Sequence, residues 1–292
     1  RHKGEELKQY HKDLAASVQR HCEHVIFHVL NRLHALTGLD RVCIAGGVAQ
    51  NSVANGKITR NTPFKEVYIP SAGHDAGISM GSAQYHIHAN LGVSRVAMLR
   101  RAHTGCRYTN EEVEQYLQKE GVEYTRYSSD EELYDVVSDA LMSGKVIGWF
   151  NGRAEFGPRA LGGRSIIADP SRSDAKDLLN SKIKRRESFR PFAPSILSEH
   201  VADWFELDEP VPFMEKVFPI KKERQAQIPA VTHVDGSGRL QSVYKDVTPR
   251  YHGLISAFYA KSGVPILLNT SFNENEPIVN APEHAYACFA RT

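Results

Sequence analysis

The side chains of this sequence best suited to chemistry are basic ones gathered between residues 145 and 190. This stretch holds eleven Lys or Arg against five Asp or Glu, whereas the whole chain of 292 residues has a net charge of only +2. Among glycines and a proline this stretch carries Arg153, Arg159 and Arg164, and the KIKRRESFRPFAP segment follows with Lys184, Arg185, Arg186 and Arg190. Glycines around the first group allow backbone N–H groups to approach an anion, and guanidinium groups match phosphate oxygens bidentately. The pattern predicts a compact phosphate or acyl-phosphate site.

A solvated basic face or a nucleic-acid patch is the alternative interpretation of such a run of charge. The residues between these charges are Gly, Pro, Phe and Ala, and this composition favours the compact anion site. Because the chain as a whole is almost neutral, we do not expect it to be coated by nucleic acid.

Two further segments carry hydrogen-bonding groups at the end of an apolar strand. LLNTSFN places Asn269, Thr270, Ser271 and Asn273 where they could position a phosphate or a carboxamide, although an ordinary Ser/Asn turn remains the alternative. AGGVAQN places Gly46, Gly47 and Asn51 at a strand-to-helix turn, which favours a cradle for nucleotide phosphates. The second segment matches neither of the common glycine-rich nucleotide-binding loops.

Candidates for metal and covalent chemistry are weaker. Asp75 follows a glycine at a helix start, where a carboxylate holds a metal ion or, as we favour from the pattern alone, caps the helix. His21, His24 and His28 share a helical face but lack an H-E-x-x-H pattern, so we assign them no metal role. No G-x-S-x-G elbow and no cysteine beside an obvious base supports a covalent mechanism.

The elements that must position these residues alternate between helix and strand. In the first part we expect helices over residues 6–37, 51–58 and 75–89 and strands over 41–47 and 66–70, with Gly38 ending the first helix. Residues 93–110 show no clear period and mark a junction between a domain of residues 1–98 and one of residues 99–292. In α/β folds of this kind ligands bind beyond the carboxyl ends of strands.

The second part repeats the alternation. We expect helices over residues 111–121, 131–144, 174–183, 200–207, 250–263 and 281–289. We expect strands over residues 122–127, 145–150, 165–169, 191–197, 213–220, 264–269 and 276–280, a polar segment over 221–227 and a hairpin over 233–243.

Composition narrows the class of protein. Hydrophobic residues make up 41% and charged residues 24%, as in an ordinary globular protein of two domains. No run of 18 apolar residues occurs and the first residues lack an apolar signal core, so we expect no membrane partner. Four scattered cysteines indicate a reduced, cytoplasmic setting. The chain has no initial Met, and we expect both ends to be cuts through a longer protein.

Four long segments, in this order, resemble the C-terminal domain of the O-carbamoyltransferases related to nodulation proteins and to aminoglycoside and cephamycin carbamoylation enzymes: GWFNGRAEFGPRALGGRSIIADP, KIKRRESFRPFAPSIL, VDGSGRLQSV and GVPILLNTSFNENEPIV. Upstream, CIAGGVAQNSVANGKI and PSAGHDAGISMGSA resemble the end of the actin-like ATPase-type domain of that family. The resemblance covers nearly the whole chain from about residue 14. It implies a partial actin-like α/β unit followed by a threonylcarbamoyl-adenylate-synthase-like α/β domain with a twisted mixed sheet.

This resemblance implies that the C-terminal domain turns carbamoyl phosphate and ATP into carbamoyl adenylate. The K-x-R and S-x-N signatures of its fold match Lys184 with Arg186 and Ser271 with Asn273. Carbamoyl phosphate would be held by Arg159, Lys184, Arg190, Arg239 and Ser271, and the catalytic roles would fall to Lys184, Arg159 and Arg190. The stretch KKERQAQIPAVTH and the NENEP sequence depart from the family pattern without removing an assigned residue.

The same resemblance implies that the first domain passes the carbamoyl group to a hydroxyl of a sugar or secondary metabolite. Gly46, Gly47 and Asn51 match its nucleotide loop, and Asp75 matches an aspartate that holds a divalent metal, iron or magnesium, together with a His-x-x-x-His pair. That pair belongs to an N-terminal half that this chain lacks. We therefore expect these 292 residues to form the adenylate without completing the transfer.

Two other functions stay open at this point. A protein of tRNA threonylcarbamoylation or hydrogenase maturation would share the chemistry, but we would expect zinc-finger or acylphosphatase segments that the sequence lacks. A non-catalytic nucleotide- or RNA-binding module would use the basic stretch alone. The sequence also leaves open the acceptor, the metal and the oligomeric state, a homodimer included.

Overall fold

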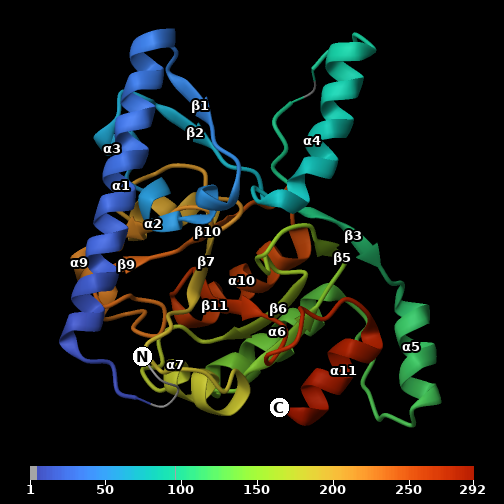
Figure 1. Cartoon of the computed structure of the whole chain (residues 1–292). Coiled ribbons are helices and arrows are strands. Elements are labelled where there is room, and N and C mark those ends of the chain that lie inside the picture. The colour runs from blue at the N-terminus through green and yellow to red at the C-terminus, as the bar shows by residue number, and fades with distance from the viewer. Residues whose placement is uncertain (1–4, 96) are drawn as a thin grey trace.

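The computed structural model describes residues 5–95 and 97–292, and its centre is a single five-stranded mixed sheet (Figure 1). The strands run in the order β10-β7-β11-β6-β4. Their bounds are β4 Ile147–Phe150, β6 Arg164–Ala168, β7 Ala193–Leu197, β10 Gln241–Val243 and β11 Ile266–Ser271. β11 pairs antiparallel with both neighbours, β4 pairs antiparallel with β6, and β10 pairs parallel with β7. The mixed α/β fold predicted from the sequence is confirmed.

The sheet forms the core because its central strands are covered on both faces. Every residue of β6 and β7 is buried, and β11 starts with the fully buried Ile266, Leu267 and Leu268. Burying each such aliphatic side chain stabilises the fold by about 1.5–3 kcal/mol relative to leaving it exposed. This frame is rigid, and the loops that leave its strand ends carry the basic residues.

Helices of the second part pack around this sheet. They are α5 Asn110–Lys119, α6 Asp130–Met142, α7 Ala175–Leu178 with the π-helical turn η4 Leu179–Ile183, the 3₁₀ turn η5 Ser198–His200, α8 Val201–Trp204, α9 Lys222–Gln225, α10 Pro249–Ser262 and α11 Pro282–Arg291. Ser129 caps α6 through its side chain, and Gly263 ends α10 with φ of 73°. α6 packs on α10, and α11 packs on β4 and α5.

The first part is smaller and built on one long helix. Its elements are α1 Gln9–Thr37, β1 Arg41–Cys43, the 3₁₀ turn η1 Gly47–Gln50, α2 Ser52–Asn55, α3 Ile58–Asn61, β2 Glu66–Tyr68, the 3₁₀ turn η2 Asp75–Gly77, α4 Ile78–Tyr85 and the π-helical turn η3 His86–Asn90. β1 and β2 pair parallel as a sheet of two strands. Gly38 ends α1 in the left-handed conformation, as the sequence predicts. The core here is small and consists of Leu30, Val42, Ile58 and Phe64.

One face of α1 packs on this core, and a second apolar stripe faces away from it. Exposed members of the stripe are Leu14, Val18, Val25, Val29 and Leu36, which recur at helical spacing. α1 and α4 extend to the same end of the molecule, at the top of Figure 1. Among residues 5–95 and 97–292, no helix has the length and apolar character needed to cross a membrane.

Several short elements differ from the sequence expectation. Residues 122–127 and 276–280 form no strand. The hairpin expected over 233–243 is absent because its two halves pair elsewhere: β9 (Ser237–Gly238) pairs with β8 (Phe218–Pro219), and β10 pairs with β7. The polar segment 221–227 contains the short helix α9. These pairings depend on residues distant in sequence, and local patterns do not report them.

The two parts of the chain are in contact. Val217 N donates to Ser52 O at 2.9 Å, and Asn55 Nδ2 donates to Glu215 O at 2.9 Å. β3 (His103–Arg107) pairs with β5 (Arg153–Glu155), so the chain joins the second part soon after residue 98. The proposed boundary between residues 98 and 99 stays a prediction, and contacts cross it.

Burial raises the pKa of Glu215, at this contact, to about 7. Between pH 4.5 and 7 the native state therefore holds more protons than the unfolded chain, and the free energy of unfolding falls as pH rises through this window. Glu215→Gln does not titrate and should be more stable than the parent at pH 8, by up to about 3 kcal/mol, but not at pH 5. Urea unfolding at both pH values measures this, with the exposed Glu206→Gln as control. Equal gains at both pH values would contradict it.

Candidate functional site

Three arginines from separate loops approach one another at one end of the sheet. Arg159 lies between β5 and β6, Arg186 between η4 and β7, and Arg239 between β9 and β10. Burial lowers the pKa of Arg239, and the positive charges of Arg159 and Arg186 lower it further. Among the described residues, neither Arg159 nor Arg239 forms a salt bridge, and the buried Arg239 Nε has no hydrogen-bond partner. A bound anion would relieve the repulsion among such neighbouring like charges.

Arg186 is held in place by neutral groups. Its Nε donates to Asn180 Oδ1 at 2.7 Å, and its guanidinium lies 4.8 Å from the centre of the Phe192 ring. Asn180 Nδ2 in turn donates to the carbonyl oxygens of Ser188 and Arg190, which fixes the loop before β7. These contacts orient the guanidinium without a carboxylate hydrogen-bonded to it, although the charge of Glu187 acts on it from a distance.

Arg190 lies at the rim of this cluster. Its side chain is exposed and its Nε lies 2.9 Å from Glu187 Oε2. After the effect of burial, the charge of Arg190 is the largest influence that lowers the pKa of Arg186, so the two cations are neighbours. An exposed cation that already has a carboxylate partner contributes less to anion affinity than a desolvated one.

Lys184 joins the two signatures predicted from the sequence. Its buried Nζ lies 2.5 Å from Ser271 O, 3.2 Å from Ser271 Oγ, and 2.7 Å from both O and Oδ1 of Asn273. Desolvation, followed by the charge of Arg186, lowers the pKa of Lys184 to about 8. An ammonium has three protons, and oxygens of the protein take all of them here. Lys184 therefore fixes the loop after β11 next to the arginines.

Arg153 and Arg164 of the basic stretch do not join the cluster. The guanidinium of Arg164 lies in the core, 3.6 Å from the centre of the Phe150 ring. Its Nη atoms donate to five carbonyl oxygens, those of Cys106, Asn151, Gly152, Gly163 and Asn280. Arg153 is exposed and donates to Gly105 O. The sequence pattern could not separate these structural arginines from the others.

His233 is a neighbour of the cluster that the sequence interpretation missed. Its Nδ1 lies 3.1 Å from Ser237 Oγ, which donates its single proton to Asp235 Oδ1 at 2.6 Å. Ser237 Oγ must then accept from Nδ1–H, so Nε2 carries the lone pair. Burial lowers the pKa of His233, and the charge of Arg239 lowers it as well. The H-x-D-x-S spacing of His233, Asp235 and Ser237 is the sequence pattern that could have indicated this hydrogen-bonded group.

The predicted nucleotide loop of the first part is open on one side. Gly46 has φ of 103° and its N–H donates to Gly73 O at 2.6 Å, which ties this loop to the segment before η2. No atom lies within 4 Å of a Cβ placed on Gly46 or Gly47. Asn51 is engaged by the protein itself, since its Oδ1 accepts from Ala54 N and its amide bonds to Gln19. The space beside the two glycines would admit a phosphate, but the Gly46 N–H and the Asn51 side chain are already occupied by the protein.

Asp75 is exposed at the first position of η2. The side chain that caps this turn is that of His74, whose Nδ1 accepts from Ala76 N at 3.1 Å. Within residues 5–95 and 97–292, no group of three or more His, Cys, Asp or Glu residues could hold a metal ion, and His21, His24 and His28 form none. These residues alone do not fit a resident metal.

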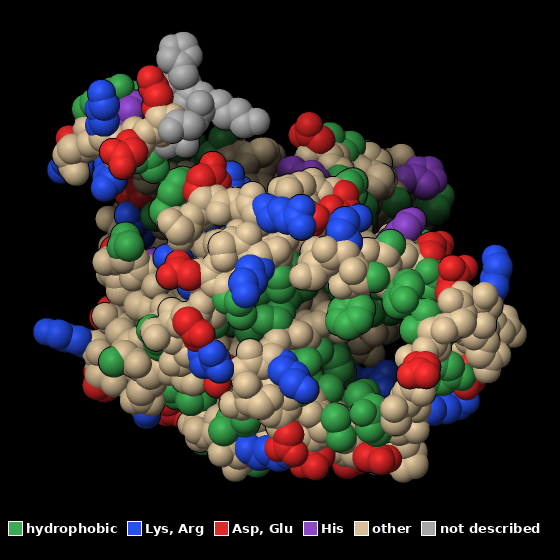
Figure 2. All heavy atoms as spheres, turned by 90° about the horizontal axis from the view of Figure 1, so that it is seen from below, with side chains coloured by type: hydrophobic (Ala, Val, Ile, Leu, Met, Phe, Trp, Pro, Cys, Tyr) green, Lys and Arg blue, Asp and Glu red, His purple; other side chains and the backbone are tan. Residues whose placement is uncertain are grey.

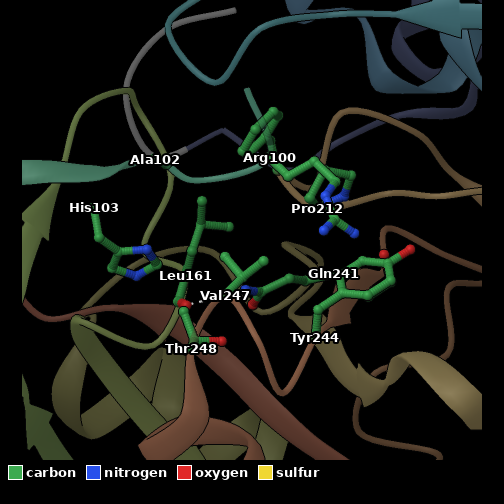
Figure 3. Close-up of a pocket in the computed structure, with 11 residues that line it drawn as sticks. Arg100, Ala102, His103, Leu161, Pro212, Gln241, Tyr244, Val247 and Thr248 are labelled. Carbon is green, nitrogen blue, oxygen red and sulfur yellow. Dashed lines mark hydrogen bonds between the residues drawn. The ribbon is translucent and has the colours of Figure 1, made fainter. Parts of the chain in front are cut away.

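A cavity lies apart from the arginine cluster, between residues 100–103 and β10 (Figure 3). It is lined by Arg100, Ala102, His103, Leu161, Pro212, Phe213, Gln241, Ser242, Tyr244, Val247 and Thr248. Leu161 brings the cavity next to the loop that carries Arg159, but none of the predicted site residues lines it.

The chain matches two family descriptions. Residues 1–84 match "Carbamoyltransferase N-terminus" and residues 138–292 match "Carbamoyltransferase C-terminus". An uncharacterized protein of Synechocystis is 45% identical over 98% of this chain and 51% of its own length. Nodulation protein NolNO of Sinorhizobium fredii is 42% identical over 100% of this chain and 44% of its own length. Nodulation protein NolO of Bradyrhizobium diazoefficiens is 40% identical over 100% of this chain and 54% of its own length.

The chain thus spans about half the length of the curated relatives it matches. Among solved structures, full-length HypF in its phosphate- and nucleotide-bound form has a TM-score of 0.38 at 19% identity, over 57% of this chain and 20% of that chain. The resemblance noted in the sequence is confirmed by the family matches, the longer of which covers more than half of the chain. This chain belongs to the carbamoyltransferase family.

Proposed function

We propose that this chain is the part of an O-carbamoyltransferase that binds carbamoyl phosphate and ATP and forms carbamoyl adenylate. The observation that carries the proposal is the cluster of Arg159, Arg186 and Arg239, which holds three neighbouring guanidinium groups and a buried, unpartnered Arg239 Nε. An unpaired buried donor costs about 1–3 kcal/mol, and a bound phosphate oxygen would remove that cost. The family membership supplies the reaction class.

The chemistry of carbamoyl activation fits such a cluster. Carbamoyl phosphate is a small dianion. One water molecule would cleave it to phosphate and carbamate, and the carbamate oxygen would then displace pyrophosphate from the α-phosphorus of ATP, so both leaving groups carry negative charge. Fixed guanidinium groups in a site with little water stabilise that charge without having to reorganise. In this proposal Arg159, Arg186 and Arg239 hold phosphate oxygens, and Arg190 guides the anion at the rim. Lys184 keeps the Ser271–Asn273 loop in place beside them.

The first part would accept the adenylate near Gly46 and Gly47 and transfer the carbamoyl group to a hydroxyl of a small acceptor such as a sugar. Backbone N–H groups at the start of η1 suit phosphate oxygens. Asp75 would contribute one ligand to a divalent metal, which would polarise the carbamoyl carbonyl. The remaining ligands would come from outside the described residues.

We infer that an N-terminal half, as in the longer relatives, covers the second apolar stripe of α1. The relatives are about twice as long as this chain. A parallel sheet of two strands, β1 and β2, is too small to be stable alone and is usually covered on both faces. The stripe from Leu14 to Leu36 leaves five large apolar side chains in water, which is typical of an interface.

RNA binding by the basic stretch is the second candidate, and the distribution of charge argues against it. Arg164 and Lys184 are buried, and Arg190 and Arg172 pair with carboxylates. On the face seen in Figure 2, basic side chains are interspersed with acidic ones and form no continuous patch. RNA affinity would fall by orders of magnitude between 50 and 200 mM salt, whereas phosphate affinity in a compact site would change little.

Arg159→Ala and Arg239→Ala should each lower the rate of ATP–pyrophosphate exchange that depends on carbamoyl phosphate. The expected loss is about a hundredfold, on the order of 3 kcal/mol of transition-state stabilisation, because one charge-assisted contact to a phosphate oxygen disappears. Calorimetric titration with inorganic phosphate should show weaker binding of both variants.

The matched control is Arg172→Ala, which removes an arginine of the same stretch that pairs with Asp174 at the surface. It should exchange at the parent rate. Parent-like exchange and phosphate binding by both Arg159→Ala and Arg239→Ala would refute the assigned site.

Replacing Val18 and Val29 by Gln should leave the free energy of unfolding of this chain within about 0.5 kcal/mol of the parent, since both side chains are exposed. The double variant should bind the N-terminal portion of the Synechocystis relative, produced as a separate chain, at least tenfold more weakly than the parent. Arg20→Gln, elsewhere on α1, is the control. Equal binding of parent and double variant would remove the stripe from the interface.

A further inference from the structure

A carboxylate that none of the preceding roles uses lies inside the loop that carries Arg159. Glu155 ends β5, and only 4% of its side chain is exposed. Its Oε1 accepts from Leu161 N at 2.6 Å, from Gly163 N at 2.7 Å and from Arg164 N at 3.3 Å. One oxygen atom therefore gathers three backbone N–H groups from the far end of the loop.

This carboxylate closes the loop of residues 156–163. Arg159 stands midway between Glu155 and the N–H groups that bond to it, so the contact holds both ends of the segment that presents the guanidinium. The first backbone N–H of the loop, that of Phe156, donates to Ala102 O, outside the loop. Charge-assisted hydrogen bonds to N–H groups are roughly twice as strong as neutral ones, so losing the carboxylate releases several contacts at once.

Other parts of the chain pack closely around Glu155 and its loop. A Cβ on Gly163 would lie 3.1 Å from Glu155 Oε1 and 2.8 Å from Arg153 O. On the outer side, Ser71 Oγ donates to Phe156 O at 2.9 Å, and a Cβ on Gly157 would lie 2.5 Å from Ser71 O. The first part of the chain thus supports the outside of the loop, while Glu155 holds it from within.

Among the described residues, no Lys or Arg side chain forms a salt bridge with this carboxylate, although its charge acts on the nearby Arg164. The Nε2 atom of His103 lies 3.7 Å from Glu155 Oε1, beyond hydrogen-bond distance. Neither ring nitrogen of His103 has a hydrogen-bond partner in the described part of the chain, and the ring lines the cavity beside Leu161 (Figure 3). Burial lowers the pKa of His103, which keeps the ring neutral near pH 7. The charge of Glu155 is thus stabilised by the backbone dipoles of the loop.

We propose that Glu155 is a positioning residue of the anion site: it does not touch the ligand but fixes the loop that places Arg159 beside Arg186 and Arg239. This inference rests on the proposed function of Arg159. An acidic residue in the GRAEFGPRALGGR segment, where every other charge is basic, is the pattern in the sequence that points to this role.

The test is a double-mutant cycle read by calorimetric titration with inorganic phosphate. Glu155→Ala should weaken phosphate binding at least tenfold, as Arg159→Ala does. The double variant should be no weaker than Arg159→Ala alone, because a guanidinium that is absent cannot be misplaced. Glu155→Gln keeps an acceptor oxygen and should recover most of the affinity, whereas Glu155→Asp keeps the charge but is too short and should not.

Asp169→Ala is the matched control, since Asp169 is also a buried carboxylate that closes a turn, through Ser171 N at 2.8 Å and Ser171 Oγ at 2.6 Å. It should lower the thermal midpoint without changing phosphate affinity. If Glu155→Ala does not fold, the phosphate affinities of Glu155→Asp and Glu155→Gln are compared with that of the parent instead. The inference would be overturned if Glu155→Ala or Glu155→Asp bound phosphate as tightly as the parent. It would also be overturned if the losses of phosphate affinity of the two single variants added fully in the double variant. If Arg159→Ala itself binds phosphate normally, it is the proposed function that fails.

Discussion

Repulsion among like charges is the constraint that the second part of this chain must satisfy. Arg159, Arg186 and Arg239 are partly or fully withdrawn from water, and in that surrounding each cation raises the energy of the others. An asparagine and a phenyl ring, both neutral, hold Arg186 in place. For the Arg159 loop the holding group is a carboxylate, which bonds to backbone N–H groups. The stability of the five-stranded sheet sustains this arrangement.

Buried cations in this protein are of two kinds, and the difference lies in their partners. Arg164 and Lys184 bond to oxygens of the protein: the Nη atoms of the arginine donate to five carbonyl groups, and the lysine donates to oxygens of Ser271 and Asn273. Only the Nε of Arg164 lacks a partner among the described residues. Both side chains act as internal cross-links between distant segments. Arg239 differs from both, because the like charges of Arg159 and Arg186 lie beside it and it forms no salt bridge among the described residues, which favours the proposed anion site there.

The loop around Arg159 also connects the two parts of the chain. Its outer side contacts Ser71, and the segment after Ser71 bonds to Gly46 through the carbonyl of Gly73. The loop that presents Arg159 thereby lies between the proposed phosphate site and the proposed nucleotide loop. The relatives combine both parts in one longer chain, which is consistent with a shared task.

The sequence by itself determined the family, the α/β class, the long helix ended by Gly38 and the main strands, because periodicity, capping and glycine turns depend on neighbouring residues. It also singled out Arg159, Arg186, Arg239 and the Lys184 and Ser271 signatures. Only the tertiary structure decided that Arg164 belongs to the core, that 233–243 is no hairpin, and that Glu155 closes the Arg159 loop. Desolvation and hydrogen-bond saturation are set by atoms far away in the chain, as for Arg164 and the carbonyl of Asn280, and such partners meet only in the folded molecule.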